Sequence, residues 1–183
     1  MNMQSLLPFT FNPSSFIDDF VSFFELMVNS FPVTERRTPE HAERLFRECD
    51  YYKVIGTKDN NDKVTSFLAY WLLNDFCFID HLAVDESLRN KGRGGALVVH
   101  FLQNTTQPIV LEVEPPADET SQRRIAFYQR LGFHLNPYHY EQPSMQPGQP
   151  AIPLHIMSYP EPLPKDTFEN YVDELYRKVY FFK

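Results

Sequence analysis

A glycine-rich and basic segment, residues 82–97, has the composition of a phosphate-binding loop. It carries three glycines and three cationic side chains, namely Arg89, Lys91, Gly92, Arg93, Gly94 and Gly95. A strand pattern precedes these residues and a helical pattern follows, so their amides should lie at a helix N-terminus, where they are unpaired and the helix dipole is positive. Glycines let an anion approach the backbone, and cations add favourable charge. The sequence predicts a phosphate site; the alternative is a glycine-rich turn with solvated basic side chains.

Carboxylates on two expected strands are candidates for acid–base chemistry. Glu112 and Glu114 alternate with apolar residues, so both should point to one face of their strand. That face is either the wall of a cleft or a solvated surface. Asp80 and His81 are adjacent and should lie on opposite strand faces, where His81 is more typical of a hydrogen-bonded core residue than of a base. Four further histidines do not have the spacing of metal ligands, so no metal site is expected. They are His100, His134, His139 and His155.

Composition and charge indicate one soluble domain, residues 1–183. The chain has 17 Lys and Arg against 24 Asp and Glu, and this acidic balance argues against a protein that binds nucleic acid through its phosphates. Cys49 and Cys77 are far apart and outside any CxxC pair, as expected of reduced core thiols. Residues 1–10 lack the pattern of a signal peptide, and no apolar run reaches the length of a membrane span. We therefore expect a cytoplasmic protein with no membrane role.

Two helices are expected before the first strand, in an N-terminal unit of about residues 14–50. Apolar residues recur at helical spacing from 16 to 27, with Ser14 or Ser15 as the cap. The second helix should begin with Thr38 as its cap and Pro39 as its first residue.

Three strands should follow as a meander, at residues 51–57, 64–73 and 76–84, and the last of these is apolar enough to be a central strand. The residue pattern then predicts a helix over 96–102, a strand over 108–114 and an amphipathic helix over 118–130.

The C-terminal third combines strands with a proline-rich segment. Strands are expected at 133–140 and 154–159, and four prolines between them indicate a long loop. Asp166 and Glu169 form a capping-box-like pair at the start of a last helix. Alternating strands and helices in a chain of this length indicate a single α/β or α+β layer structure.

Two motifs resemble the GNAT N-acetyltransferase superfamily. Residues 89–94, Arg-Asn-Lys-Gly-Arg-Gly, match the signature Gln/Arg-x-x-Gly-x-Gly/Ala between the fourth strand and the next helix. Residues 121–133 follow the pattern Asn-x-x-Ala-x-x-Phe-Tyr-x-x-x-Gly-Phe, with Ser121 and Arg124 in the Asn and Ala places. Residues 79–85 resemble Ile-Glu-x-Leu-Ala-Val-Asp, with Asp80 in the Glu place, and residues 31–37 resemble a Phe-Pro-x-x-Glu-Arg stretch of some bacterial members. The matches extend over about residues 20–160 in the family's order.

The resemblance implies a mixed, mostly antiparallel sheet flanked by helices, splayed between the fourth and fifth strands, with an extra C-terminal helix. It implies acetyl-CoA as cosubstrate and no metal. The pyrophosphate would lie on the amides of residues 89–95, and the pantetheine arm would pair with the backbone of 82–84 as an added strand. Ser121 is either a helix cap or a contact to the CoA arm. The implied cofactor-binding residues are Leu82, Ala83, Val84, Arg89, Asn90, Lys91, Gly92, Arg93, Gly94, Gly95, Ser121 and Tyr128.

The implied reaction is direct attack of an amine on the acetyl thioester. Tyr128 matches the family's general acid near the sulfur; alternatively, it is an aromatic on the core face of its helix. Asp80 is the positional match for the base but is one methylene shorter than the usual glutamate. Glu112 or Glu114 would recruit the ammonium group or relay its proton.

The acceptor is expected to be a small-molecule or protein amine. The first two helices and residues 142–153 occupy the places where family members build the acceptor cleft. Transfer of a longer acyl chain, transfer to oxygen and a non-catalytic CoA-binding module remain alternatives, and the protein is expected to be a monomer or a homodimer.

Overall fold

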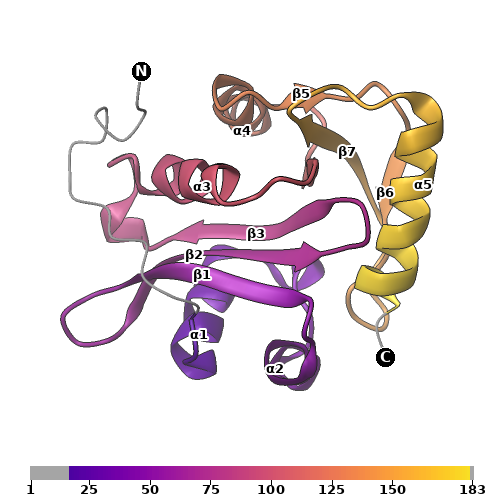
Figure 1. Ribbon diagram of the computed structural model, residues 1–183. Helices are drawn as coiled ribbons and strands as arrows, with labels where there is room; N and C mark the ends of the chain where they lie inside the picture. The colour runs from indigo at the N-terminus through magenta and orange to yellow at the C-terminus, as the bar shows by residue number, and fades with distance from the viewer. Residues whose placement is uncertain (1–16, 182–183) are drawn as a thin grey trace.

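A seven-stranded mixed sheet forms the centre of the protein (Figure 1). The computed structural model describes residues 17–181. The strands follow the order β1-β2-β3-β4-β7-β5, and β6 also pairs with β7. Their bounds are β1 Tyr52–Lys58, β2 Val64–Leu72, β3 Cys77–Val84, β4 Ile109–Val113, β5 His134–Leu135, β6 Tyr140–Gln142 and β7 Ile152–Tyr159.

Helices cover both faces of this sheet. In Figure 1, α1 and α2 lie on one side and α3 and α4 on the other, while α5 packs beside β6. Two apolar cores result: α1, α2 and α5 contribute to one, and α3 and α4 to the other. The helical bounds are α1 Phe20–Ser30, α2 Pro39–Glu48, α3 Arg93–Gln103, α4 Glu119–Arg130 and α5 Lys165–Leu175, with short 3-10 turns η2 Val33–Glu35 and η3 Glu86–Leu88, and a π-helical turn η4 Tyr176–Tyr180. The predicted mixed α/β architecture is confirmed.

The sheet opens between β3 and β4. β1, β2 and β3 form the predicted antiparallel meander, whereas β3 and β4 run parallel and pair over only three positions, Cys77 to Ile79 with Ile109 to Leu111. Beyond these positions the two strands diverge, which is the splay that the resemblance implied. The last residues of β3 thus have a backbone edge that β4 does not cover.

A β-bulge in β3 changes the direction of two side chains. Ala69 pairs with His81, but the next residue, Tyr70, pairs with Ile79, so Asp80 is the extra residue. Asp80 bonds to Arg37, and His81 contacts the backbone of Glu35. The expectation that Asp80 and His81 point to opposite faces is therefore wrong, because the bulge interrupts the alternation of the strand.

Three helix starts test the predicted caps. Thr38 caps α2 as predicted, accepting a hydrogen bond from the His41 amide, with Pro39 as the first helical residue. α1 begins later than predicted, after Asp19, whose carboxylate accepts from the Ser22 amide; Ser14 and Ser15 lie outside the described residues. α5 begins at Lys165, so Asp166 is in its first turn and is not the cap.

The strand predicted over 133–140 is wrong, because it is divided into β5 and β6. The buried side chain of Asn136 lies at the break, donating to the Ile156 carbonyl and accepting from the Leu163 amide. Pro137 follows and has no amide to donate to the ladder. Both pieces pair with β7, and the proline-rich loop connects β6 to β7.

The two cysteines are buried and unpaired, in agreement with core thiols. Across residues 17–181, no helix combines the length and the apolar character that a membrane crossing requires.

Candidate active site

A cleft of about 310 Å³ lies where β3 and β4 diverge. Residues 79–84 of β3 and 111–114 at the end of β4 form two of its walls. The connection between α1 and α2, residues Arg124 and Tyr128 of α4, and a group of residues from β6 and β7, Gln142, Ile152 and Leu154, complete it. The cleft therefore reaches Arg89 of the predicted phosphate loop at one end and includes all three predicted carboxylates, Asp80, Glu112 and Glu114.

The turn that follows Arg89, beside one end of the cleft, is built largely from backbone. Gly92 precedes α3 with φ at 75°, a left-handed conformation that favours glycine, and makes no side-chain cap. The first hydrogen bond of α3 runs from the Ala96 amide to the Gly92 carbonyl, at 3.0 Å, so the helix has no acceptor for the Gly94 and Gly95 amides. A Cβ atom at Gly94 would lie 3.6 Å from Val84, which shows how closely the loop approaches β3. These residues fit a pyrophosphate group.

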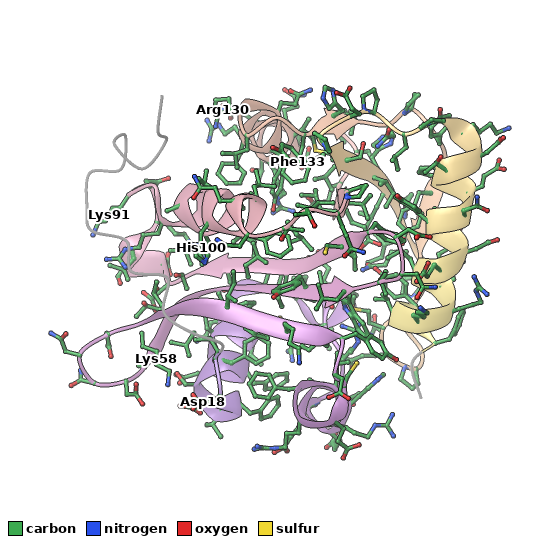
Figure 2. All side chains as sticks on the ribbon, in the orientation of Figure 1. Asp18, Lys58, Lys91, His100, Arg130 and Phe133 are labelled. Carbon is green, nitrogen blue, oxygen red and sulfur yellow. The ribbon has the colours of Figure 1, made fainter. Side chains whose placement is uncertain are left out.

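Most of the predicted cofactor residues lie along the end of β3 and the turn that leads to α3. Leu82, Ala83, Val84 and Arg89 line the cleft. The Arg89 Nε atom donates to the Val84 carbonyl at 3.2 Å, which places its charge at the end of β3. Residues 90–92 follow in the turn, and residues 93–95 form the first turn of α3. Figure 2 shows Lys91 on the turn before α3, with its side chain directed away from the body of the protein.

Tyr128 belongs to the core face of its helix and also borders the cleft, so its position is compatible with either of its two predicted alternatives. It packs in the core between β4 and α4, with its ring 5.6 Å from that of Phe133, and it also lines the cleft. Burial raises the pKa of Tyr128 to about 12, so its hydroxyl is protonated at neutral pH and can donate a proton.

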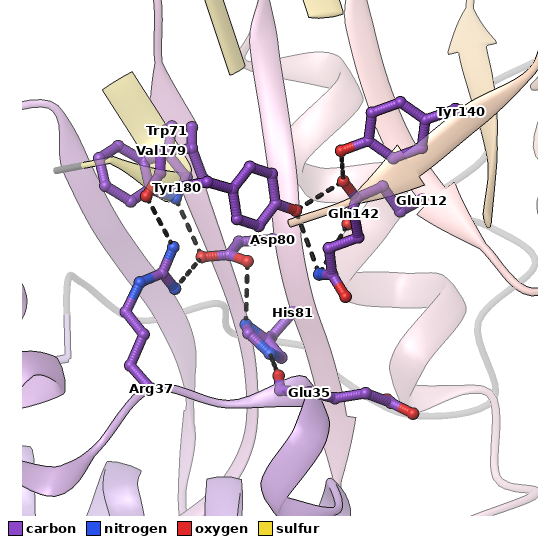
Figure 3. Close-up of polar contacts among 10 residues, drawn as sticks. All are labelled: Glu35, Arg37, Trp71, Asp80, His81, Glu112, Tyr140, Gln142, Val179 and Tyr180. Atoms are coloured by element: carbon purple, nitrogen blue, oxygen red, sulfur yellow. Dashed lines mark hydrogen bonds and ion pairs between the residues drawn. The ribbon is translucent and has the colours of Figure 1, made fainter. Parts of the chain in front are cut away.

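Asp80 is held in a buried ion pair (Figure 3). Its Oδ2 atom accepts from Arg37 and from the Trp71 indole, each at 2.9 Å, and its side chain is only 1% exposed. Burial alone raises the pKa of Asp80, but the Arg37 guanidinium, His81 and the bonds from Trp71 and Arg37 outweigh it, and the pKa lies below its ordinary value. A carboxylate so stabilised is a weak proton acceptor.

Glu112 lies in a different environment, although it belongs to the same cluster in Figure 3. Tyr140 and Tyr180 donate to its Oε1 atom, the latter at 2.5 Å, and Gln142 donates to Oε2 at 3.1 Å. Burial raises the pKa of Glu112 to about 7, against the opposing effect of the two tyrosine bonds. This carboxyl group can therefore gain and lose a proton near neutral pH.

Glu114 and Glu35 add two more carboxylates to the cleft wall. Glu114 follows the end of β4 and forms an ion pair with Arg124 of α4. Burial and the negative charge of Glu114 raise the pKa of Glu35. The Glu112/Glu114 face is thus a cleft wall, which decides between the two predicted alternatives.

His81 and Ser121 have structural partners. The Nε2 atom of His81 lies 2.8 Å from the Glu35 carbonyl, and its side chain is 5% exposed, as expected for a hydrogen-bonded core histidine. Ser121 forms a capping box with Asp118, whose carboxylate accepts from the Ser121 amide at 2.8 Å. Ser121 is not part of the cleft wall among the described residues, and its contact with the CoA arm stays a prediction.

Sequence reasoning missed Arg37 and Tyr180 as partners of the two buried carboxylates. Arg37 lies in the 31–37 stretch that resembles the family, so a signal for it existed. Tyr180 carries no local motif, and its partner Glu112 is distant in the sequence. Gln142 belongs to the 142–153 segment that was expected at the acceptor cleft, and it lines the cleft. Within residues 17–181, no group of three or more His, Cys, Asp or Glu side chains is placed to hold a metal ion.

Comparisons with known proteins agree with this geometry. The profile of the acetyltransferase (GNAT) family matches residues 20–133. A putative GNAT acetyltransferase from Bacteroides thetaiotaomicron is 31% identical, with a TM-score of 0.82, over 93% of this chain and 100% of that one. Comparison with curated protein sequences gives no match.

Two more distant structures share the fold. The ribosomal-protein-S18-alanine N-acetyltransferase from Escherichia coli is 18% identical, with a TM-score of 0.61 over 83% of this chain and 95% of that one. An aminoglycoside 6'-N-acetyltransferase complexed with coenzyme A is 16% identical, with a TM-score of 0.59 over 82% of this chain and 98% of that one. With the profile match over most of the chain and a relative aligned over nearly all of it, the splayed sheet and its glycine-rich loop have one explanation: the chain belongs to the GNAT acetyltransferase family.

Proposed function

We propose that the protein transfers the acetyl group of acetyl-CoA to an amine of a small molecule or a protein. The observation that carries the proposal is the single cleft in which the uncovered edge of β3, Tyr128 and Glu112 meet. Acetyl-CoA, when bound, supplies the activated acetyl thioester. The Gly94 and Gly95 amides and the edge formed by residues 82–84 are the groups that would hold it.

Glu112 is the base in this proposal. An amine attacks a thioester only in its neutral form, so a group in the cleft must accept its proton, directly or through water. The pKa of Glu112, raised to about 7 by burial, suits that task, whereas the pKa of Asp80 is lowered and its carboxylate is engaged by Arg37. We therefore assign Asp80 to holding the site together and Glu112 to proton transfer.

Tyr128 is the acid. It lines the cleft and its hydroxyl is protonated at neutral pH, so a proton is available to a sulfur leaving group, although burial raises the pKa of Tyr128 to about 12 and weakens it as an acid. Tyr128 and Glu112 come from different elements and both line the cleft, so they can serve the leaving group and the nucleophile respectively.

The charge of the cleft supports an amine acceptor. Glu35, Glu112 and Glu114 all line it. Of the two arginines that line it within residues 17–181, Arg124 is already paired with Glu114, and Arg89 lies at the end next to the α3 loop. Carboxylates attract an ammonium group and repel an anionic acceptor. The two distant structural neighbours named above are N-acetyltransferases, which also favours nitrogen over oxygen. Two buried, unpaired cysteines are consistent with a reducing compartment, and we propose the cytoplasm.

The test is thiol release from acetyl-CoA with a panel of amines, measured for wild type, Tyr128→Phe and Glu112→Gln. We expect each substitution to lower kcat by about 100-fold, the usual contribution of general acid or base catalysis. In wild type, kcat/KM should fall as the pH drops below about 7, because Glu112 becomes protonated, and Glu112→Gln should lack this limb.

Matched controls are Glu141→Gln, on the neighbouring strand β6, and Tyr159→Phe, at the end of β7. Neither residue lines the cleft within the described chain, so both variants should behave as wild type. Tight acetyl-CoA binding without transfer to any amine would instead identify a CoA-binding module. Transfer that survives Glu112→Gln unchanged would remove Glu112 from the mechanism.

A further inference from the structure

Two residues of the C-terminal turn η4, Val179 and Tyr180, belong to the polar cluster around both buried carboxylates (Figure 3). The carbonyl of Val179 accepts from Arg37 Nη2 at 3.2 Å, and the same guanidinium binds Asp80. The next residue, Tyr180, sends its hydroxyl to Glu112. Two consecutive residues near the end of the chain therefore contact both halves of the polar cluster.

The three donors around Glu112 are unequally placed. Gln142 lines the cleft together with Glu112, whereas Tyr140 and Tyr180 are not part of the cleft wall among the described residues. Both hydroxyls bond to Oε1, and among residues 17–181 the donor to Oε2 is Gln142. Two donors occupy the lone pairs of Oε1, so Oε2 keeps one lone pair to accept a proton.

Tyr180 is itself held in one orientation. Its hydroxyl accepts from Gln142 Nε2 at 3.1 Å while it donates to Glu112 at 2.5 Å. The bond between Arg37 and the Val179 carbonyl fixes the backbone on one side of it. The hydroxyl therefore has a defined donor role and is not a freely rotating group.

Several other titratable groups around Glu112 also affect its pKa. Tyr140 of β6 and Tyr180 of η4 favour the charged carboxylate by hydrogen bonding, and Arg37 favours it by charge, whereas the negative charge of Asp80 on β3 opposes it. Tyr176, also in η4, is close enough to Glu112 for its own pKa to be affected, but its hydroxyl donates to the Glu141 carbonyl at 2.6 Å.

We propose that Tyr180 is a positioning residue for Glu112: its hydroxyl fixes Oε1, stabilises the charged carboxylate and leaves Oε2 to receive the proton of the acceptor. The inference rests on the proposed function of Glu112. Tyr180 lies outside residues 20–133, the part that matches the family profile, so this chain supplies the residue from its own C-terminal turn.

The decisive experiment follows the carboxyl group itself. Protein labelled with carbon-13 at glutamate side-chain carboxyls is titrated by NMR, and Glu112→Gln identifies the Glu112 signal. Loss of a hydrogen bond to the charged form should move the midpoint upward in Tyr180→Phe by about one pH unit or more. Tyr176→Phe is the matched control, since it removes a hydroxyl from the same turn without touching Glu112, and its midpoint should equal that of wild type.

A double-mutant comparison adds a kinetic readout. Tyr180→Phe should move the acid limb of kcat/KM upward with the titration midpoint, and it should have no further effect in the Glu112→Gln background. Circular dichroism confirms folding. Should Tyr180→Phe fail to fold, Tyr180→His, whose ring N–H can still donate, repeats the titration with a smaller expected shift.

A midpoint in the folded Tyr180 variant that moves no more than in Tyr176→Phe overturns the inference. The titration needs no acetyl transfer, so its outcome is separate from that of the proposed function. If the midpoint moves as expected and no amine is acetylated, Tyr180 positions Glu112 but the proposed reaction is wrong.

Discussion

The two ends of the cleft are built in opposite ways. The end at α3 consists of backbone amides and one strand edge from a continuous stretch, residues 82–95. The end at Glu112 consists of side chains from segments far apart in the sequence, including Arg37, Asp80, Tyr140 and Tyr180. The first end presents hydrogen-bond donors to a ligand, whereas the second satisfies most of its own polar groups internally.

This difference indicates which end of the cleft also stabilises the fold. The α3 loop is largely exposed, and a Cβ atom at Gly92 would meet open space. The other end buries an ion pair whose charges depend on each other in a medium of low polarity. Changes in the loop should therefore affect binding, and changes in the buried cluster should affect folding first.

Even within the buried cluster, two carboxylates behave differently. The Arg37 guanidinium compensates for the burial of Asp80 and holds its pKa below the ordinary value. Glu112 receives only neutral donors, so burial prevails and its pKa rises to about 7. The partner of a buried carboxylate thus decides whether it holds the structure or exchanges protons.

The largest expected effect is on folding at the buried end. Arg37→Met leaves Asp80 buried without its counterion, and the free energy of unfolding should fall by about 3–5 kcal/mol in denaturant titrations. Arg47→Met is the control, because its pair with Glu43 is exposed and should contribute about 0.5 kcal/mol.

The double variant Arg37→Met/Asp80→Asn removes both charges and should recover part of the loss. Equal destabilisation by Arg37→Met and Arg47→Met would show that the buried end does not stabilise the fold as argued.

A smaller effect, on binding alone, is expected at the backbone end. Gly94→Glu places a carboxylate beside the α3 N-terminus, where it competes with a phosphate group, and CoA affinity measured by calorimetry should fall about tenfold or more. The space beside Gly94 accepts a Cβ atom in ordinary contact with Val84, so the melting temperature should change little.

Gly94→Gln separates charge from size, because it adds a similar side chain without a charge. Indistinguishable CoA affinities for the Glu and Gln variants would argue against an anion site at α3.

The smallest effect is expected at Ser121, which distinguishes a structural from a ligand-binding hydroxyl. Its hydroxyl accepts from the Asp118 amide at 3.1 Å in the α4 capping box, so Ser121→Ala should lower stability by about 1 kcal/mol and leave CoA affinity unchanged. Thr120→Ala, at the exposed neighbouring position, should change neither quantity. A selective loss of CoA affinity in Ser121→Ala would place this hydroxyl in the cofactor site.

Features that depend on near neighbours could be predicted from the sequence. The glycine-rich loop, the meander, the α2 cap and the proline-rich connection each follow from a few adjacent residues. Their physical cause is local: backbone conformation, helix termini and the alternation of apolar residues.

Features that depend on contacts between residues distant in the sequence could not be predicted in this way. The predicted strand over 133–140 was wrong because Asn136 bonds to residues of β7 and of the loop that follows it. Strand alternation predicted Asp80 and His81 on opposite faces. That prediction was wrong because the bulge at Asp80 is set by pairing with β2. Both are decided by tertiary contacts that override a local pattern.

The sequence by itself determined the glycine-rich turn before α3 and the order of the elements around it, because these depend on backbone and short-range spacing. Only the tertiary structure decided how the two buried carboxylates differ in pKa. Asp80 and Glu112 are both acidic residues on apolar strands, and nothing near either one in the sequence separates them. The fold brings Arg37 to the first and Tyr140 and Tyr180 to the second, and that choice of partners sets the two pKa values apart.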